Sequence, residues 1–228
     1  MKRYSQFEEQ DHILHAVKNI TEGRFLDIGC WDAVTFSNTR ALFELGWSGV
    51  MIEPSPGPFV ELLRTCTQCT TGVDEREHEP YGQRKTRECK VCGGNRYGFQ
   101  SRVQLVLGAV GSEPGFVKLS ATDDALTTAP DSASRKTWDA LGGFYGDFWV
   151  PMITLEDIAN RWGGFDFINI DVEGISTELF LKMLALGWQT KCVAVETDGR
   201  DQEIISAATP LHYHVVYGNG TNLVLVRQ

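Results

Sequence analysis

The stretch FLDIGCWDAVTF at residues 25–36 constrains the fold of this chain most, together with GVMIEP at residues 49–54. Its apolar start predicts a short buried strand, and Gly29 falls where that strand must turn sharply into a helix. Asp27 lies at the end of this strand, and Glu53 ends the second strand, one helix further along. The layout is typical of a βαβ nucleotide-binding unit, in which the second acid binds the ribose hydroxyls.

The glycine pattern indicates which nucleotide fits. Cys30, Trp31, Asp32 and Ala33 follow Gly29, so the motif differs from the dinucleotide fingerprint GxGxxG. A single glycine flanked by acids suits S-adenosylmethionine, which has no pyrophosphate to hold, better than it suits a dinucleotide. We therefore expect S-adenosylmethionine as the cofactor, with Gly29, Trp31 and Asp32 on the loop that contacts it.

Several further motifs resemble those of the FkbM-type methyltransferases, whose first motif usually reads DIGANDGVT. They follow the family's order: YSQFEEQD at 4–11, DIGCWDAVT at 27–35, LGAVG at 107–111, ITLEDI at 153–158, INIDVEG at 168–174 and TNLVLVR at 221–227. The resemblance covers most of the chain except residues 66–97. Ala33 departs from the motif's later glycine, and Ser176 stands where the family often has glutamate after VEG.

The resemblance implies a Rossmann-like class I methyltransferase fold and an O-methyltransferase activity. It places Asp27 near the methionine amino group of the cofactor, Glu53 on the ribose and Ala109 beside the adenine. It also places Gln6 near the cofactor; the alternative is that the first helix is a structural lid without chemistry.

Asp171 is the first candidate for a general base or a group that orients the acceptor, and Glu173 is the second. Two alternatives stay open: Asp171 only holds the cofactor, and Glu173 caps the following helix, where a negative charge is favoured. A divalent ion between Asp171 and Glu196 has no support from ligand spacing.

Hydrophobic periodicity predicts an α/β fold with a mostly parallel sheet that ends in an antiparallel hairpin. Helices are expected at 5–20, 35–45, from about 59, at 154–162 and at 177–186. Strands are expected at 25–28, 50–53, 103–110, 116–119, 165–170, 192–195, 212–217 and 222–226. Ligands bind beyond the carboxyl ends of such strands, where these acids should converge: Asp27, Glu53, Asp171, Glu173, Glu196 and Asp198.

Two CxxC pairs predict a structural zinc site in an insertion at residues 64–98 of a single domain at 1–228. The pairs are Cys66 with Cys69 and Cys89 with Cys92, and their separation is that of a four-cysteine zinc site. Two disulfides or four unused thiols are the alternatives. His78, between the pairs, is a further ligand candidate, although a solvated surface histidine is the simpler interpretation.

Residues 121–151 are rich in small residues, glycine and aromatics. We consider two interpretations equally: a flap on the acceptor side, or an aromatic cluster that covers a sheet edge. The aromatic side chains concerned are Phe144, Tyr145, Phe148 and Trp149.

Composition limits the partners. A net charge of -9 argues against broad binding to a nucleic-acid backbone, although residues 84–102 form a local basic segment. A chain with a polar start and no apolar run of membrane-spanning length is expected in the cytoplasm.

The expected acceptor is a hydroxyl of a sugar or glycan, or of a small hydroxylated metabolite. A non-catalytic module that docks a partner through the zinc insertion is the alternative from another class. Nucleic-acid methylation is a third, weakened because DVEG replaces the amino-methylating motif [DNS]PP[YFW] after the fourth strand. The oligomeric state does not follow from the sequence.

Overall fold

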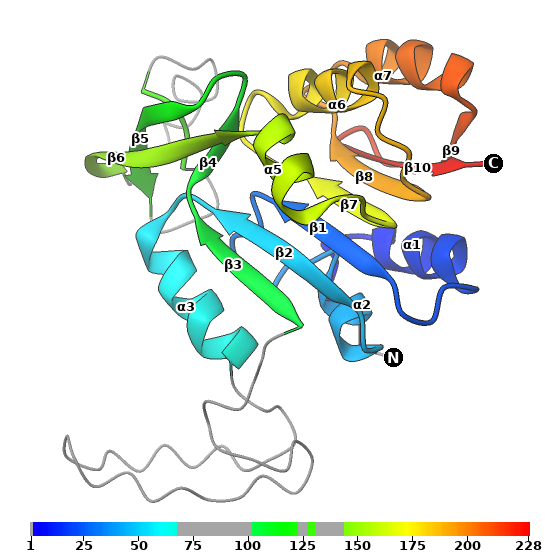
Figure 1. Cartoon of the computed structure of the whole chain (residues 1–228), viewed down its shortest axis with the longest axis horizontal. Helices are drawn as coiled ribbons and strands as arrows, with labels where there is room; N and C mark the ends of the chain where they lie inside the picture. Colours follow the sequence, from blue (N-terminus) through cyan, green and yellow to red (C-terminus); the bar gives the residue numbers. More distant parts are fainter. Residues whose placement is uncertain (1, 68–101, 123–126, 131–143) are drawn as a thin grey trace, which may run out of the picture.

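The structure is a computed structural model that describes residues 2–67, 102–122, 127–130 and 144–228. Its centre is a seven-stranded sheet with the order β3-β2-β1-β7-β8-β10-β9 (Figure 1). The strands are β1 (Arg24–Ile28), β2 (Ser48–Glu53), β3 (Val103–Leu107), β7 (Phe167–Ile170), β8 (Cys192–Glu196), β9 (Tyr213–Gly218) and β10 (Asn222–Arg227).

Parallel pairing dominates this sheet. β1 pairs in parallel with β2 and β7, β2 with β3, and β7 with β8, whereas β10 runs antiparallel to β8 and β9. The strand order reverses at β1, so the carboxyl ends of β1 and β7 flank the switch point where open α/β sheets bind ligands. The predicted Rossmann-like fold with a closing hairpin is confirmed.

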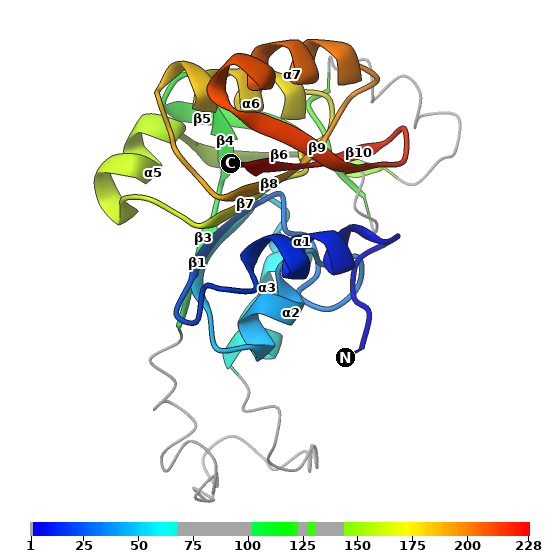
Figure 2. The same ribbon diagram turned by 90° about the vertical axis from the view of Figure 1, so that its right-hand side faces the viewer.

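Helices cover both faces of the sheet (Figure 2). One face carries α1 (Glu9–Val17), α2 (Arg40–Glu44) and α3 (Pro56–Thr67), and the other carries α5 (Leu155–Trp162), α6 (Ser176–Ala185) and α7 (Asp201–Ala208). A short 3-10 helix, η1 (Thr209–Leu211), follows α7. Because the inner strands β1, β2, β7, β8 and β10 are buried on both faces, their alternate residues enter two separate apolar cores.

A second, three-stranded sheet with the order β4-β6-β5 adjoins the end of β3 (Figure 1). It consists of β4 (Ala109–Gly111), β5 (Gly115–Thr122) and β6 (Phe144–Thr154). The prediction of one strand at 103–110 was therefore wrong. The chain changes sheets at Gly108, whose amide donates to the Glu53 carbonyl at 3.1 Å, and a Cβ there would lie 3.0 Å from the Pro151 carbonyl oxygen.

The other elements match the predictions with shifted ends. α1 and α2 are shorter than expected, because the segments before them form bends and turns, and α7 was not predicted. Thr154 caps α5 in a capping box with Asp157. Among the described helices, none has the length and apolar character needed to cross a membrane.

The predicted flap at 121–151 is in part a regular antiparallel arm of β5 and β6. Trp149 pairs with Lys118 on its outer face and is 65% exposed, so Trp149 does not line a closed pocket. The side chains of Phe144 and Tyr145 lie outside the described part of the chain. The same holds for the cysteines of the predicted zinc site: Cys66, Cys69, Cys89 and Cys92.

Candidate functional site

The strand-end acids share one face of the sheet. Leu26 and Ile28 enter the core beneath α5 to α7, whereas Phe25 enters the core beneath α1 to α3, so Asp27 also points to the α1 side. The same alternation along β2, β7 and β8 places three more carboxylates on this side, at the carboxyl end of the sheet. We call these residues the carboxylate row: Asp27, Glu53, Asp171 and Glu196.

Asp27 is buried beneath the loop that follows β1. Its side chain is 1% exposed, and its two carboxylate oxygens accept hydrogen bonds from the Thr39 hydroxyl and, at 2.8 Å, from the Asn169 amide. Asn169 in turn accepts from the Asn38 amide at 2.9 Å. Burial raises the pKa of Asp27 to about 6, and the hydrogen bonds from Thr39 and Asn169 oppose this shift. Asp27 thus anchors the loop at residues 29–39 from below.

The predicted cofactor loop passes very close to the neighbouring strand end. Gly29 has φ 77°, and a Cβ at this position would lie 1.8 Å from the carbonyl oxygen of Asp171. Trp31 has φ 38°, and its ring stacks on that of Phe36 with the centroids 6.1 Å apart. Asp32 accepts from the amides of Val34 and Thr35 at 2.6 and 2.8 Å, so its carboxylate shapes the loop.

Glu53 ties this loop to β2. Its carboxylate accepts from the Trp31 amide at 2.8 Å and from the Ser55 amide at 2.7 Å, and its side chain is buried. Burial raises the pKa of Glu53, although both amides lower it. Ala109 begins β4, directly after Gly108 has bonded to the Glu53 backbone. The structure therefore brings together the predicted loop, ribose and adenine residues.

Asp171 and Glu196 end neighbouring strands. Ile170 is in register with Val195, which makes Asp171 and Glu196 the next pair beyond the ladder. Asp171 is exposed at the strand edge. Its pKa is raised, first by desolvation among the strand ends and then by nearby negative charges, of which that of Glu173 is the largest.

Glu196 is partly buried and accepts from the Ser176 hydroxyl at 3.3 Å. Burial, followed by the charge of Asp171, raises the pKa of Glu196 to about 8. The Ser176 hydroxyl also closes the turn after β7, because it accepts from the Val172 amide and donates to the Val172 carbonyl, both at 2.9 Å. Ser176, which departs from the family pattern, thus links the start of α6 to the row.

Glu9 is a site residue that the sequence reasoning missed. Its side chain is 0% exposed and lies at the start of α1. The carboxylate accepts from the Phe7 amide at 2.9 Å and from the side-chain amides of Asn219 and Asn222 at 3.0 and 3.1 Å. Gln6, the predicted residue of this segment, is exposed. The leader motif at 4–11 was the only signal in the sequence for Glu9.

The row has no cationic partner in the part of the chain that the structure describes. Within the described residues, no ion pair reaches Asp27, Glu53, Asp171, Glu196 or Glu9. The described part of the chain also contains no group of three or more His, Cys, Asp or Glu side chains placed to hold a metal ion. Because clustered carboxylates repel one another, a positively charged ligand would stabilise this edge.

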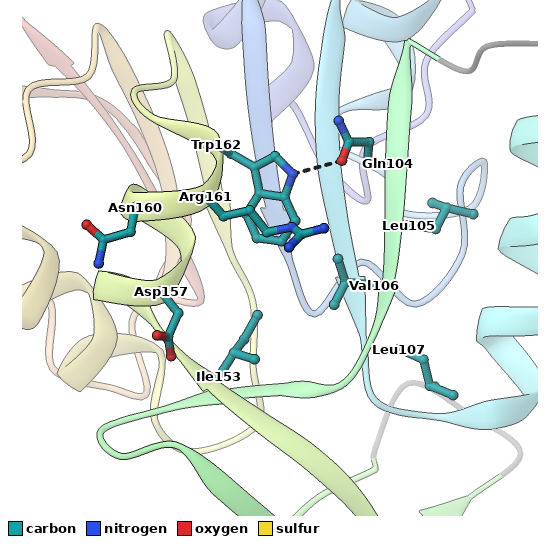
Figure 3. Close-up of a pocket in the computed structure, with 9 residues that line it drawn as sticks. All are labelled: Gln104, Leu105, Val106, Leu107, Ile153, Asp157, Asn160, Arg161 and Trp162. Atoms are coloured by element: carbon teal, nitrogen blue, oxygen red, sulfur yellow. Dashed lines mark hydrogen bonds between the residues drawn. The ribbon is translucent and has the colours of Figure 1, made fainter.

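A cavity of about 790 Å³ lies elsewhere, between α5 and the outer strand β3 (Figure 3). It includes no member of the carboxylate row. At one end the Trp162 indole donates to Gln104 at 2.8 Å. Asp157 lies apart from this pair, and its carboxylate is held in the capping box with Thr154. Its remaining lining is Leu105, Val106, Leu107, Ile153, Asn160 and Arg161. We place the candidate site at the row rather than here, because this cavity has no comparable cluster of reactive groups.

The fold and the row define a Rossmann-like α/β protein with a cluster of carboxylates at its strand ends. No family model matches the chain, and no curated protein matches it. Among solved structures, it is similar to the methyltransferase FkbM from Methylobacillus flagellatus KT, with a TM-score of 0.49 and 12% sequence identity. That match covers 90% of this chain and 44% of the other, so this chain spans less than half the length of that protein.

Proposed function

We propose that this chain is an S-adenosylmethionine-dependent methyltransferase that methylates a hydroxyl of a sugar or glycan, or of a small hydroxylated metabolite. The observation that carries the proposal is the carboxylate row, which has no cation among the described residues and adjoins the close approach at Gly29. The motif resemblance at 27–35 and 168–174 supports the choice of reaction.

The charge of the ligand distinguishes this cofactor from other nucleotides. S-adenosylmethionine has a positive sulfonium and a positive ammonium group against one carboxylate, whereas dinucleotides and nucleoside phosphates are anions. A row of carboxylates that has no ion pair among the described residues attracts the former and repels the latter. Glu53 donates no proton to its two amide partners, and each of its oxygens keeps a lone pair that can accept from a ribose hydroxyl.

Bound S-adenosylmethionine would supply a methyl group already activated by the positive sulfur. The residues of this chain would align the acceptor hydroxyl with that methyl and remove the hydroxyl proton. Asp171 fits the second role, since the residue lies at the exposed edge of the strands and its raised pKa of about 7 suits proton transfer near neutral pH. Glu173, in the same turn, remains the second candidate.

Calorimetric titration with S-adenosylhomocysteine tests the cofactor assignment. We expect Glu53→Gln to weaken binding about tenfold or more, because an amide cannot accept from both backbone amides and the ribose, and each bond to a charged group contributes about 1.5–3 kcal/mol. Glu113→Gln, on the exposed turn before β5, is the matched control and should bind normally. No binding by the wild-type chain would favour a non-catalytic docking module instead.

An acceptor screen with labelled methyl donor, starting with sugars, then tests the reaction. Asp171→Asn should keep its affinity for S-adenosylhomocysteine, which lacks the sulfonium charge, and lose turnover. Loss of affinity without an effect on the remaining turnover would reassign Asp171 to cofactor binding.

The same proposal includes a structural zinc ion held by the cysteines of the 64–98 insertion. Their CxxC spacing supports it, and these residues lie outside the described ranges. We expect about one zinc per chain by metal analysis and a lower melting temperature after chelation. Freshly purified protein without zinc would refute this part.

A further inference from the structure

Glu9 joins two distant parts of the chain beside the carboxylate row. Two of its hydrogen-bond partners come from the β9–β10 hairpin: Asn219 lies in the turn, and Asn222 is the first residue of β10. Asn222 is also in register with Glu196, so the Glu9 carboxylate lies one strand beyond the end of the row. α1 packs against β8 and β10 at this point.

The charge of Glu9 is held by hydrogen bonds alone. N–H donors from Phe7, Asn219 and Asn222 face it, and no described cation does. Both carboxylate oxygens accept, so a glutamine at this position would leave an N–H donor facing its own NH2 group. The carboxylate is therefore required by its contacts, and it brings a buried negative charge to the end of the row without a described cation to neutralise it.

The charge of Glu9 also acts on Asp171, the candidate base. Glu9 is among the negative groups that raise the pKa of Asp171, together with Glu173, Asp27 and Asp198. The other carboxylates of the row on this face are Glu53 and Glu196. Inside a partly desolvated site, the field of a buried charge extends beyond its own contacts.

We infer that Glu9 is a specificity-determining residue, which makes the site bind the positively charged methyl donor in preference to its uncharged, demethylated product. This inference rests on the proposed function. S-adenosylmethionine and S-adenosylhomocysteine share the adenosine and the amino-acid groups, and they differ by the methyl group and one positive charge. A buried negative charge near the row therefore favours the donor and helps the product to leave.

The test compares the dissociation constants of the two ligands by calorimetry, without an acceptor. Glu9→Gln should lower the preference for S-adenosylmethionine by about fivefold, the effect of one charge that acts from outside direct contact. Asn219→Ala is the control, because it removes the Asn219 donor to Glu9 and the two hairpin hydrogen bonds that Asn219 accepts, but keeps the carboxylate. It should therefore change both affinities by the same factor. Equal loss for both ligands in Glu9→Gln would overturn the inference.

A second variant keeps the test valid if Glu9→Gln folds poorly. Asn219 is exposed, so Asn219→Lys places a cation beside Glu9, at the cost of the two hydrogen bonds that Asn219 accepts from the Thr221 and Asn222 amides. It should also lower the preference for S-adenosylmethionine, and an unchanged ratio would count against the inference. If the wild-type chain binds neither ligand, the proposed function fails and the inference fails with it. Binding of both ligands with equal affinity refutes the inference alone.

Discussion

Gly29 lies where two backbones approach closely. Its positive φ could be adopted by other residues at a moderate cost, but a side chain has no space there, since the Asp171 carbonyl oxygen occupies the position of a Cβ. The contact is to backbone, so relief requires the end of β7 to move. The residue therefore fixes the spacing between the cofactor loop and the candidate base.

Gly29→Ala should lower the free energy of unfolding by about 4 kcal/mol or more, as expected for a substitution that displaces backbone in a core. Gly187→Ala is the matched control. Gly187 also has a positive φ of 73°, but nothing lies within 4 Å of the position that a Cβ would take. Only the left-handed conformation should therefore lower the free energy of unfolding, by about 1–2 kcal/mol. Urea unfolding of both variants measures the difference. Similar losses would show that the close approach does not matter.

The sequence indicated which candidate carboxylates would lie at one edge of the sheet, because they lie at or directly after strand ends. Asp27, Glu53 and Asp171 each end an apolar run, and the topology of parallel strands brings such ends together. It did not predict that Asp27 would be buried under the loop, because Thr39 and Asn169 reach it only in the folded chain. Glu9 was missed for the same reason, since its side-chain partners are 210 and 213 residues away.

At the scale of elements, the turn between β7 and α6 holds both candidate catalytic carboxylates. Ser176 is 0% exposed. Its hydroxyl accepts from the Val172 amide, and its proton faces both the Val172 carbonyl and the Glu196 carboxylate. The turn is further fixed by Asp198, which accepts from the Thr177 amide at 3.0 Å. Its shape therefore depends on side chains from the next strand and the loop after it.

Ser176→Ala should cost about 1–3 kcal/mol of unfolding free energy, because the Val172 amide loses its acceptor. Ser206→Ala provides the control, since the Ser206 hydroxyl donates at 2.6 Å to a carbonyl of its own helix on an exposed face. That change should stay within about 0.5 kcal/mol. Denaturant titration distinguishes the two, and equal effects would contradict a role for Ser176 in the turn.

Elements with strong periodicity were predicted well, and those decided by tertiary contacts were not. β1, β7 and β8 are continuous apolar runs whose type follows from composition. The switch from β3 to β4 depends instead on Gly108 meeting Pro151, a residue of the arm that no local pattern connects to it. The short α2 has a similar cause, because Thr39 bonds to Asp27 before the helix begins.

At the scale of the whole molecule, the carboxylate row makes stability depend on pH. Folding raises the pKa of Asp27 from 3.8 to about 6, that of Asp171 from 3.8 to about 7 and that of Glu196 from 4.5 to about 8. The folded state thus binds these protons more tightly than the unfolded state. The contribution is fully present below the unfolded values and is lost as pH rises through the folded ones.

We expect the free energy of unfolding of the ligand-free chain to decrease as pH rises from about 5 to about 8. The carboxyls of Glu44, Glu156, Asp157 and Glu203, whose pKa values are lowered, titrate below this window. S-adenosylmethionine should stabilise the protein more at pH 8 than at pH 6, because more of the row is then ionised. Urea unfolding across this range, with and without ligand, measures both effects; a stability that rises with pH would contradict them.

The hydrogen bonds between Glu9 and the hairpin also affect the order in which the chain can fold during synthesis. α1 is synthesised before β8 and β10, the strands that it covers. Until those strands emerge, α1 can pack only against earlier elements such as α2, and Glu9 lacks its described donors Asn219 and Asn222. The contacts of Glu9 therefore form only after synthesis of the hairpin, so the proposed cofactor site is completed late.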